Sequence, residues 1–397
     1  MATKHKYLIP MSSPEITEAD RHAVMEVLNT PTLSMGPYIE TFEQAICRYT
    51  GSQYAIGVSS GTTGLHLCVR AAGITSGNLV ITTPFSFVSS ANVILFENAT
   101  PVFVDVEEST GNMDVSQTRQ AVIDLAAGGK SAQRWLPSQG VNEEGKLKAV
   151  LIVDVFGQPA DLNALRAIAD EFQLKLIEDS CEALGAETRD TKAGRGGDYG
   201  VFAFYPNKQI TAGEGGMVIT DDKEAAELMR ALRNQGRAPG DTWLQHTYLG
   251  YNYRMDEMSA ALGLSQLQRL DKMIHRRGQV AQWYDQRLTQ IAGIHPPMIA
   301  PTTKRVSWFV YVVQLTDNLD RDLLASLLEN EGIPVRPYFL PIHLQPYMRE
   351  RYGYQTGMYP ITEKLGKNGL ALPFSSIMSE SQVDLVCTKL KKCISQL

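Results

Sequence analysis

Apolar residues along the first half of the chain repeat with two different periods. Spacing by three and four positions predicts helices over residues 14–30 and 38–50. Downstream, short apolar runs alternate with further helical patterns. The expected strands cover 54–58, 79–82, 101–106, 149–155 and 174–177, and the expected helices cover 61–72, 89–96 and 161–172. Strands that alternate with helices predict an α/β fold, with a largely parallel sheet covered on both faces.

The second half of the chain changes character. Apolar runs at 201–204 and 217–220 predict two strands around a Gly-rich turn, and a long helical pattern fills 255–288. A strand at 308–315 and helices at 320–330 and 380–396 then predict a smaller unit. We therefore expect a large α/β domain with an N-terminal arm over 1–270 and a smaller C-terminal α+β domain over 271–397. Residues 124–148 are interpreted as an irregular surface excursion.

Composition excludes several classes of protein. The 397 residues are 44% hydrophobic and 20% charged, as in an ordinary globular protein with a large core. The net charge is −6 and no basic cluster stands out, so no nucleic-acid partner is expected. Five scattered cysteines without a C-x-x-C pair, and seven histidines without metal-ligand spacing, indicate neither a disulfide framework nor a metal site. No long apolar run is present and residues 1–6 lack a signal-peptide pattern, so we expect a cytoplasmic protein with no membrane segment.

Polar residues follow directly after four of the predicted strands. They are Ser59, Thr83, Asp179 and Tyr205. Binding sites of parallel sheets lie outside the carboxyl ends of the strands. The topology therefore predicts that these four positions converge on one site.

Lys208 is the one cation in the stretch from Val201 to Thr220. It follows a strand end and Pro206, and precedes the turn through Gly213 and Gly215. Apolar and aromatic neighbours desolvate an amine, which disfavours its charged form, and a neutral amine is the nucleophile that forms a Schiff base. The alternative is a solvated lysine at a loop tip, which holds for most lysines.

Small residues fill the stretch from Ser59 to Gly64, between a predicted strand and a predicted helix. A helix start of this kind offers free amide groups to an anion such as phosphate. The alternative is a plain helix N-cap. The stretch is not a Walker loop, because the G-K-[ST] ending is absent.

Two further positions have a functional and a structural interpretation. Asp179 closes a predicted strand, where a carboxylate is placed to accept a hydrogen bond from a buried cationic nitrogen; alternatively it caps a helix. Phe87 precedes a predicted helix and is suited to stacking on a planar ring; alternatively it packs in the core.

An amine, an acid, a helix start and an aromatic ring are what a protein contributes to pyridoxal phosphate chemistry. Their order along the chain resembles the DegT/DnrJ/EryC1/StrS sugar aminotransferases, and the resemblance covers nearly the whole chain. The motifs that carry it are S-S-G-T at 59–62, T-P-F-S-F at 83–87, E-D-S-C-E-A-L-G-A at 178–186, F-A-F-Y-P-N-K-Q at 202–209, G-E-G-G at 213–216, G-Y-N-Y-R-M-D-E at 250–257, R-P-Y-F-L-P-I-H-L-Q-P-Y at 336–347 and A-L-P-F at 371–374.

The resemblance implies an aspartate-aminotransferase-like fold (fold type I) and a homodimer with active sites at the interface. By position, Lys208 would bind pyridoxal 5'-phosphate through its amine and move protons during catalysis. Asp179 would bind the pyridine nitrogen. Gly61 and Thr62 would offer amides to the phosphate, and Phe87 would lie against the ring.

Three other assignments follow from the same resemblance. Glu182 stands near the cofactor hydroxyl, where relatives usually have Gln or His, and a carboxylate beside a phenolate needs a proton or an intervening water. Asn252, with Arg254 as second candidate, would reach the phosphate of the neighbouring subunit. His343 would contact the sugar or diphosphate of the substrate, or else belong to a structural loop.

One position departs from the family pattern. Relatives often have a serine that donates to the phosphate at the position of Ala203. An alanine side chain has no donor, so that contact is lost or is replaced, for example by water.

The function implied by the resemblance is transfer of an amino group from glutamate, which leaves as 2-oxoglutarate, to a nucleotide-linked keto sugar. A 4-keto-6-deoxy sugar is the commonest substrate type in the family. The alternatives are an aminotransferase acting on a keto-cyclitol, a related sugar dehydratase and a regulatory binding protein. Dehydratase relatives have His where this chain has Lys208. A nicotinamide dehydrogenase is a further alternative, but the glycines from Gly194 to Gly197 do not complete its fingerprint.

Overall fold

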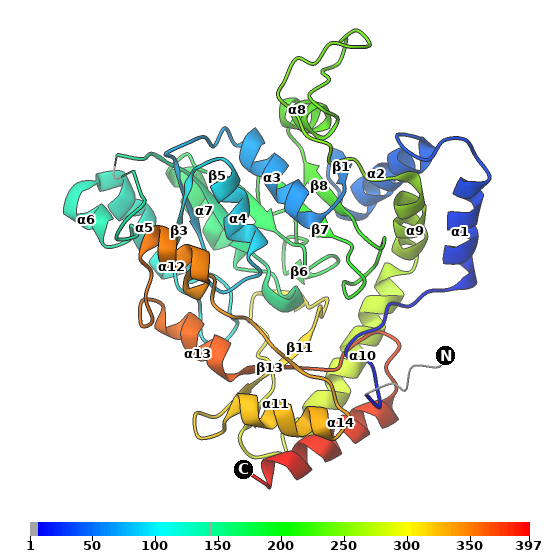
Figure 1. Cartoon of the computed structure of the whole chain (residues 1–397), viewed down its shortest axis with the longest axis vertical. Helices are drawn as coiled ribbons and strands as arrows, with labels where there is room; N and C mark the ends of the chain where they lie inside the picture. The colour runs from blue at the N-terminus through cyan, green and yellow to red at the C-terminus, as the bar shows by residue number, and fades with distance from the viewer. Residues whose placement is uncertain (1–6, 143) are drawn as a thin grey trace.

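The computed structural model describes residues 7–142 and 144–397 (Figure 1). The first six residues, where the sequence predicts no signal peptide, lie outside the described residues. A large sheet with its helices forms the upper part of the molecule, and a second, smaller sheet lies below it (Figure 1).

The large sheet has seven strands in the order β1-β8-β7-β5-β4-β2-β3. They are β1 (Tyr54–Val58), β2 (Leu79–Thr82), β3 (Thr100–Phe103), β4 (Leu147–Val153), β5 (Lys175–Asp179), β7 (Tyr199–Ala203) and β8 (Gly216–Thr220). Within this sheet β8 is antiparallel to both of its neighbours, whereas the strands from β7 to β3 pair in parallel. The carboxyl ends of β1, β4, β5 and β7 therefore lie at the same edge.

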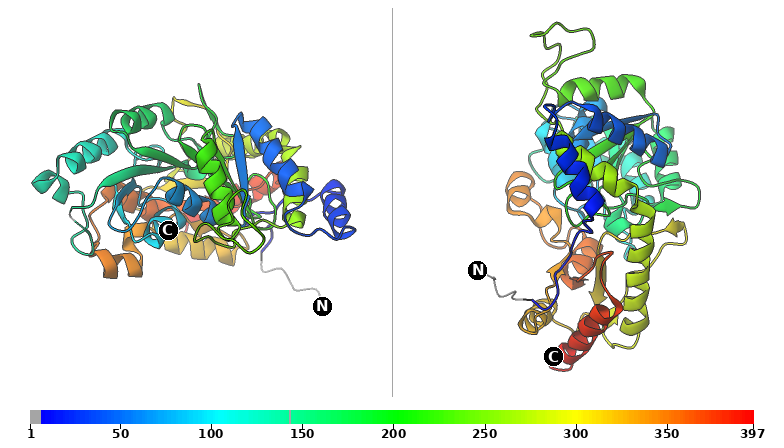
Figure 2. Two further views of the ribbon diagram at one scale, coloured as in Figure 1. Left: turned by 90° about the horizontal axis from the view of Figure 1, so that it is seen from above. Right: turned by 90° about the vertical axis from the view of Figure 1, so that its right-hand side faces the viewer.

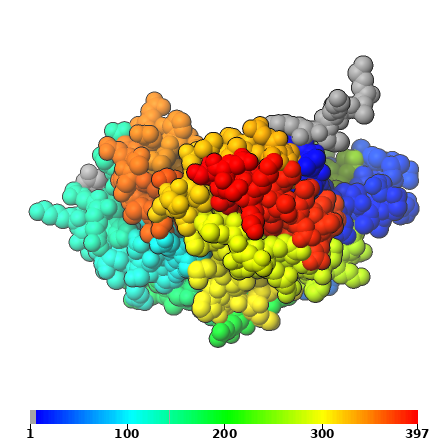
Figure 3. Space-filling model, turned by 90° about the horizontal axis from the view of Figure 1, so that it is seen from below, coloured from blue at the N-terminus to red at the C-terminus, as the bar shows by residue number. Residues whose placement is uncertain are grey.

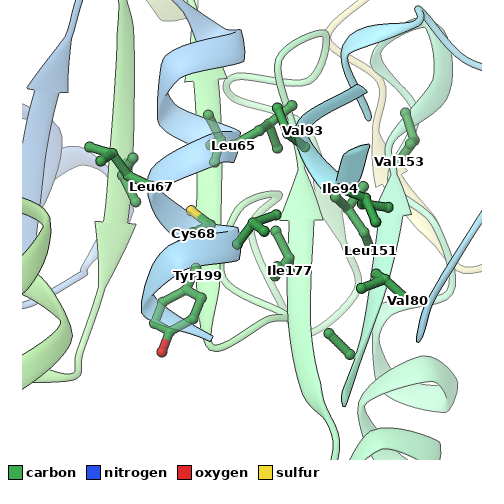
Figure 4. Close-up of a cluster of buried hydrophobic side chains, with 14 of the residues drawn as sticks. Leu65, Leu67, Cys68, Val80, Val93, Ile94, Leu151, Val153, Ile177 and Tyr199 are labelled. Carbon is green, nitrogen blue, oxygen red and sulfur yellow. The ribbon is translucent and has the colours of Figure 1, made fainter. Parts of the chain in front are cut away.

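Helices cover both faces of this sheet, because successive strand residues point to opposite sides. On one face, side chains such as Val80, Leu151 and Ile177 pack against α3 and α4 (Figure 4). On the other face, Ile81 and Ile152 pack against α5 and α7. The helices of this part are α1 (Glu18–Leu28), α2 (Pro37–Thr50), α3 (Gly61–Ala71), α4 (Ser89–Phe96), α5 (Val115–Ala127), α6 (Gly129–Gln133), α7 (Leu162–Glu171), α8 (Lys223–Arg233) and α9 (Glu257–Leu267).

The C-terminal part is built on an antiparallel sheet of four strands, β12-β13-β11-β9. Three helices pack on it, and two of them, α11 and α14, cover the lower surface of the molecule (Figure 3). The elements are α10 (Leu270–Leu288), β9 (Ile294–His295), β11 (Tyr311–Leu315), α11 (Arg321–Asn330), β12 (Arg336–Pro337), α12 (Pro346–Tyr352), α13 (Pro360–Asn368), β13 (Gly369–Leu372) and α14 (Glu380–Ile394). Short segments β6 (Glu187–Thr188) and β10 (Thr303–Arg305) pair with each other.

α10 runs from the large sheet down to the small one (Figure 2). Its first half packs in the core of the upper part through Met273 and Ile274, and its second half packs in the lower core through Tyr284 and Leu288. We retain the division into domains 1–270 and 271–397 as a proposal, with α10 as the element that both cores share.

Three sequence predictions about elements are wrong. The pattern over 255–288 is two helices, which are separated at Gln268 and Arg269 without a glycine or proline. The strand expected from Trp308 begins only at Tyr311, because Trp308 has a left-handed φ of 53°. The excursion at 124–148 contains the end of α5 and the short helix α6.

Among the described residues, no helix combines the length and the apolarity that crossing a bilayer requires.

Candidate active site

The sheet brings three loops into contact at the carboxyl edge of its strands. Gly61, after β1, faces both Ala203 at the end of β7 and Cys181 after β5. A Cβ atom at Gly61 would lie 2.8 Å from the Ala203 Cβ and 2.7 Å from the Cys181 Sγ. Glycine is therefore required at this position for the three segments to approach so closely.

The start of α3 has two roles for its amide groups. Ser60 caps the helix: its Oγ accepts from the Thr63 amide at 3.2 Å, and its carbonyl accepts from Gly64 at 3.1 Å. The amides of Gly61 and Thr62 have no acceptor in the described part of the chain. Both sequence interpretations thus apply, because Ser60 is the N-cap and the next two amides remain available to an anion.

The acids Glu178 and Asp179 point to opposite sides of β5. Glu178 is fully buried and accepts amides of Gly194 and Gly196 at 2.6 and 2.7 Å. Asp179, only 6% exposed, accepts from the Ser90 hydroxyl at 2.7 Å and from the Cys181 amide at 3.2 Å. Turns rather than a helix follow β5, so the helix-cap interpretation of Asp179 is wrong.

Lys208 lies mostly buried at the same edge. Its side chain is 13% exposed, and its Nζ lies 3.6 Å from Glu182 Oε1 and 3.8 Å from the centre of the Phe309 ring. The alternative of a solvated lysine at a loop tip is therefore wrong. The amine is held between a carboxylate and an aromatic face, both of which attract a cation.

Arg277 fixes the backbone beneath Lys208, and sequence reasoning missed it. Its guanidinium donates to the carbonyl groups of Lys208 at 2.8 Å, Trp308 at 2.9 Å and Phe309 at 3.2 Å. Burial lowers the pKa of Arg277 to about 10. Nothing in the sequence marks it, since an arginine in a charged helix ordinarily faces solvent.

The second carboxylate oxygen of Glu182 is held by a hydrogen bond. Oε2 accepts from the Phe156 amide at 3.0 Å, and Phe156 has a left-handed φ of 57° that is uncommon for a bulky residue. Burial raises the pKa of the Glu182 carboxyl, and the neighbouring Lys208 opposes that rise.

Phe87 stands open at the approach to α4. It is 63% exposed, so the core-packing alternative is wrong, whereas its neighbour Phe85 is 1% exposed and packs in the core. The segment is fixed to the start of α3 by a 2.8 Å hydrogen bond between the Thr62 and Ser89 hydroxyls. The exposed ring is thus available to a planar molecule or to a second protein surface.

Asn252 lies exposed between two tyrosines of its own chain. The flanking rings of Tyr251 and Tyr253 stack on each other at 4.7 Å and pack on His66, whose Nδ1 lies 3.0 Å from the Tyr253 hydroxyl. Asn252 is exposed, and its side chain has no hydrogen bond to the described residues. Arg254 donates to Asn234 Oδ1 at 3.0 Å.

His343 does not reach the site surface. It is 0% exposed, its Nε2 lies 3.0 Å from Glu363 Oε1, and its ring packs on Tyr359 at 4.7 Å. The expected contact with a sugar or diphosphate is therefore not supported by the structure. The structural-loop alternative fits the burial.

Comparison with known proteins decides the family. The family model described as the DegT/DnrJ/EryC1/StrS aminotransferase family matches residues 14–391. The chain belongs to this family.

Individual DegT/DnrJ/EryC1/StrS proteins match over the same extent. GDP-perosamine synthase of Caulobacter vibrioides is 34% identical and covers 97% of this chain and 98% of its own length. DesV of S. venezuelae, solved in complex with a ketimine intermediate, has a TM-score of 0.83 at 31% identity, over 94% of this chain and 93% of its own. PseC of Helicobacter pylori, an aminotransferase of pseudoaminic acid biosynthesis, has a TM-score of 0.86 at 27% identity, over 98% and 99% of the two chains.

Membership in the DegT/DnrJ/EryC1/StrS family confirms four sequence predictions: the family itself, the aspartate-aminotransferase-like α/β fold, an aminotransferase activity and pyridoxal phosphate as cofactor. The nicotinamide dehydrogenase alternative is wrong. The roles of individual residues remain proposals.

The residues present fit this cofactor. Pyridoxal phosphate needs an anion site, a partner for its ring nitrogen, a surface for its ring and an amine; these correspond to the start of α3, Asp179, Phe87 and Lys208. The Oδ1 atom of Asn207, beside Lys208, is buried without a hydrogen-bond partner among the described residues. Ala203 offers no hydroxyl, whereas the amides of Gly61 and Thr62 at the start of α3 remain available to a phosphate.

Proposed function

We propose that this enzyme transfers an amino group from glutamate to a nucleotide-linked keto sugar of the 4-keto-6-deoxy type. The observation that carries the proposal is the mostly buried side chain of Lys208, whose amine lies 3.6 Å from the Glu182 carboxylate at the edge that also presents Asp179. Similarity to a GDP-perosamine synthase and to DesV and PseC supports a sugar substrate. Glutamate is the usual donor in the family.

Each residue has a role in this proposal. When bound, pyridoxal phosphate supplies a ring that accepts electron density from the carbon next to the amino group. The negative charge of Asp179 keeps the ring nitrogen protonated. The Ser90 hydroxyl and the Cys181 amide donate hydrogen bonds to this carboxylate and stabilise its charge. Lys208 holds the cofactor and afterwards moves one proton, as general base and then acid. Phe87 covers the ring.

The proposal includes a homodimer in which Asn252 serves the partner's site. Its support is that Asn252 and Phe87 are exposed in the single chain. The loop after α8 projects from the molecule with Trp243 and Leu244 each 79% exposed and Leu249 84% exposed (Figure 1). Exposed apolar groups of this size are typical of protein interfaces.

An amination assay tests the function. The enzyme is incubated with ¹⁵N-glutamate and a panel of nucleotide-linked keto sugars and keto-cyclitols, and products are identified by mass spectrometry. We expect one panel member to gain ¹⁵N, and no transfer with Lys208→Ala. Amination of a keto-cyclitol alone, or ¹⁵N transfer that survives in Lys208→Ala, would contradict the proposal.

A further inference from the structure

The amine of Lys208 faces one carboxylate at close range. Glu182 Oε1 lies 3.6 Å from Nζ, and the two side chains are 10% and 13% exposed. This distance suits an ion pair and exceeds that of a direct hydrogen bond. A small side-chain movement is sufficient for a proton to pass between the two groups.

Glu182 is fixed in this position at two points, one on its carboxylate and one on its backbone. Its Oε2 accepts the Phe156 amide at 3.0 Å, and its own backbone carbonyl accepts from the Gln209 side chain. Gln209 follows Lys208 directly and also donates to the Ser307 hydroxyl at 2.9 Å. The carboxylate and the lysine therefore belong to one connected unit.

The other titratable groups around this pair are unsuited to accept the proton. Asp179 is already engaged by Ser90 and Cys181. Burial raises the pKa of the Cys181 thiol well above its ordinary value and that of Tyr338 to about 12, so both are protonated near neutral pH. Arg277 is a cation, and its contact with Lys208 is a hydrogen bond to the backbone carbonyl. Glu182 is thus the available acceptor among the described residues.

We propose that Glu182 is the proton acceptor of Lys208: its carboxylate stabilises the ammonium form and takes that proton when the amine becomes nucleophilic. The transfer converts the ammonium and carboxylate to a neutral amine and a carboxylic acid, so charge and protons balance without a further reactant. This proposal rests on the proposed function, since it assigns Lys208 as the reactive amine. It gives Glu182 a role on the lysine, in addition to the place near the cofactor hydroxyl that the family resemblance implies.

Trace acetylation of the full-length protein, freed of cofactor, tests the proposal. Isotopic acetic anhydride is applied over pH 6–11, and labelling at Lys208 is quantified by peptide mass spectrometry for the parent and for Glu182→Gln. The glutamine keeps an oxygen for the Phe156 amide but removes the charge. Because removal of an opposite charge at this range disfavours the ammonium form, the labelling midpoint should move to lower pH.

Two further variants complete the test. Glu182→Asp keeps the charge but moves it away from the Lys208 Nζ, so its labelling midpoint should lie between those of the parent and of Glu182→Gln. If Glu182→Gln fails to fold, Glu182→Asp replaces it in the comparison. Glu187→Gln, which removes a carboxylate paired with Lys304 and Arg305 outside the site, should leave the midpoint unchanged. Coincident curves for Glu182→Gln and the parent would overturn the proposal. The labelling experiment needs neither cofactor nor substrate. If the labelling midpoint shifts in Glu182→Gln but the enzyme aminates no substrate, only the proposed function is contradicted.

Discussion

At the scale of single residues, the two adjacent acids of β5 illustrate how local geometry assigns roles. Alternation along the strand directs Glu178 to the amides of Gly194 and Gly196, and directs Asp179 to the site. The sequence contains both acids with equal prominence. Only their positions on opposite faces separate a structural carboxylate from one that is available to a ligand.

Asp179→Asn should fold normally and lose most of its amination. The amide retains the shape and can still accept from Ser90 or Cys181, but it has no charge to keep the ring nitrogen protonated. Loss of a buried electrostatic partner of a reacting group costs roughly 100- to 1,000-fold in rate. Single-turnover conversion of the bound cofactor by glutamate, followed by absorbance, is the measurement.

Ser90→Ala is the matched control for that experiment. It removes one hydroxyl that donates to Asp179 at 2.7 Å and leaves the charge in place. Loss of one hydrogen bond should change the activation free energy of the single-turnover reaction by about 0.5–1.5 kcal/mol. This effect is well below the one expected for Asp179→Asn. Near-parental single-turnover rates in Asp179→Asn would refute the role assigned to Asp179.

At the scale of elements, α9 and α10 differ in how closely they pack against the rest of the chain. Gly263 in α9 is buried on Phe42, and a Cβ there would lie 2.7 Å from that ring. Gly278 in α10 faces open space, with nothing within 4 Å of an added Cβ. The same substitution should therefore have opposite effects in the two neighbouring helices.

Gly278→Ala should raise the free energy of unfolding by about 0.5–1 kcal/mol, because alanine loses less backbone entropy in a helix. Gly263→Ala should lower it, since overpacking a filled core costs about 1–3 kcal/mol. Urea unfolding of both variants measures the difference. Stabilisation of both, or of Gly263→Ala alone, would show that α9 does not pack on α2 as described.

The elements also show where sequence reasoning succeeds and where it fails. Strands such as 54–58 and 79–82 were predictable, because each is a short buried run bounded by turn residues. α5 and α8 were missed, although Asp114 and Asp222 cap their first turns. The break between α9 and α10 carries no glycine or proline, so no local signal marks it.

The residues of the candidate site likewise include some that the sequence predicts and others that it does not. Lys208, Asp179 and the start of α3 were predictable, because strand ends of a parallel sheet converge on one edge. Arg277 and Phe309 were not, since they come from the C-terminal part of the chain and meet Lys208 only through tertiary packing. The burial of His343 likewise depends on Tyr359 and Glu363, which are distant in sequence.

At the scale of the whole molecule, the proposed dimer predicts complementation between inactive subunits. Lys208→Ala and Asn252→Ala homodimers should each be inactive. After subunit exchange, a mixed dimer has one site with both residues intact, so some amination should return. The control mixes untagged Lys208→Ala subunits with tagged Lys208→Ala subunits. Mixed dimers then demonstrate subunit exchange, but neither of their sites has an intact Lys208.

Recovered activity would place Asn252 in the partner's site. No recovery, despite demonstrated exchange and an inactive Asn252→Ala parent, would mean that Asn252 acts within its own chain. The recovered activity can be measured as the half-reaction of the enzyme with glutamate. The test therefore does not require the identity of the sugar.

The identity of the reactive amine is the most direct test of the whole account. The purified protein is loaded with pyridoxal phosphate, reduced with borohydride and digested, and the modified peptide is identified by mass spectrometry. We predict a visible absorption band that disappears on reduction, with the phosphopyridoxyl group on Lys208, and neither band nor adduct in Lys208→Ala. An adduct on a different lysine, or an unchanged band in Lys208→Ala, would contradict the assignment of this site.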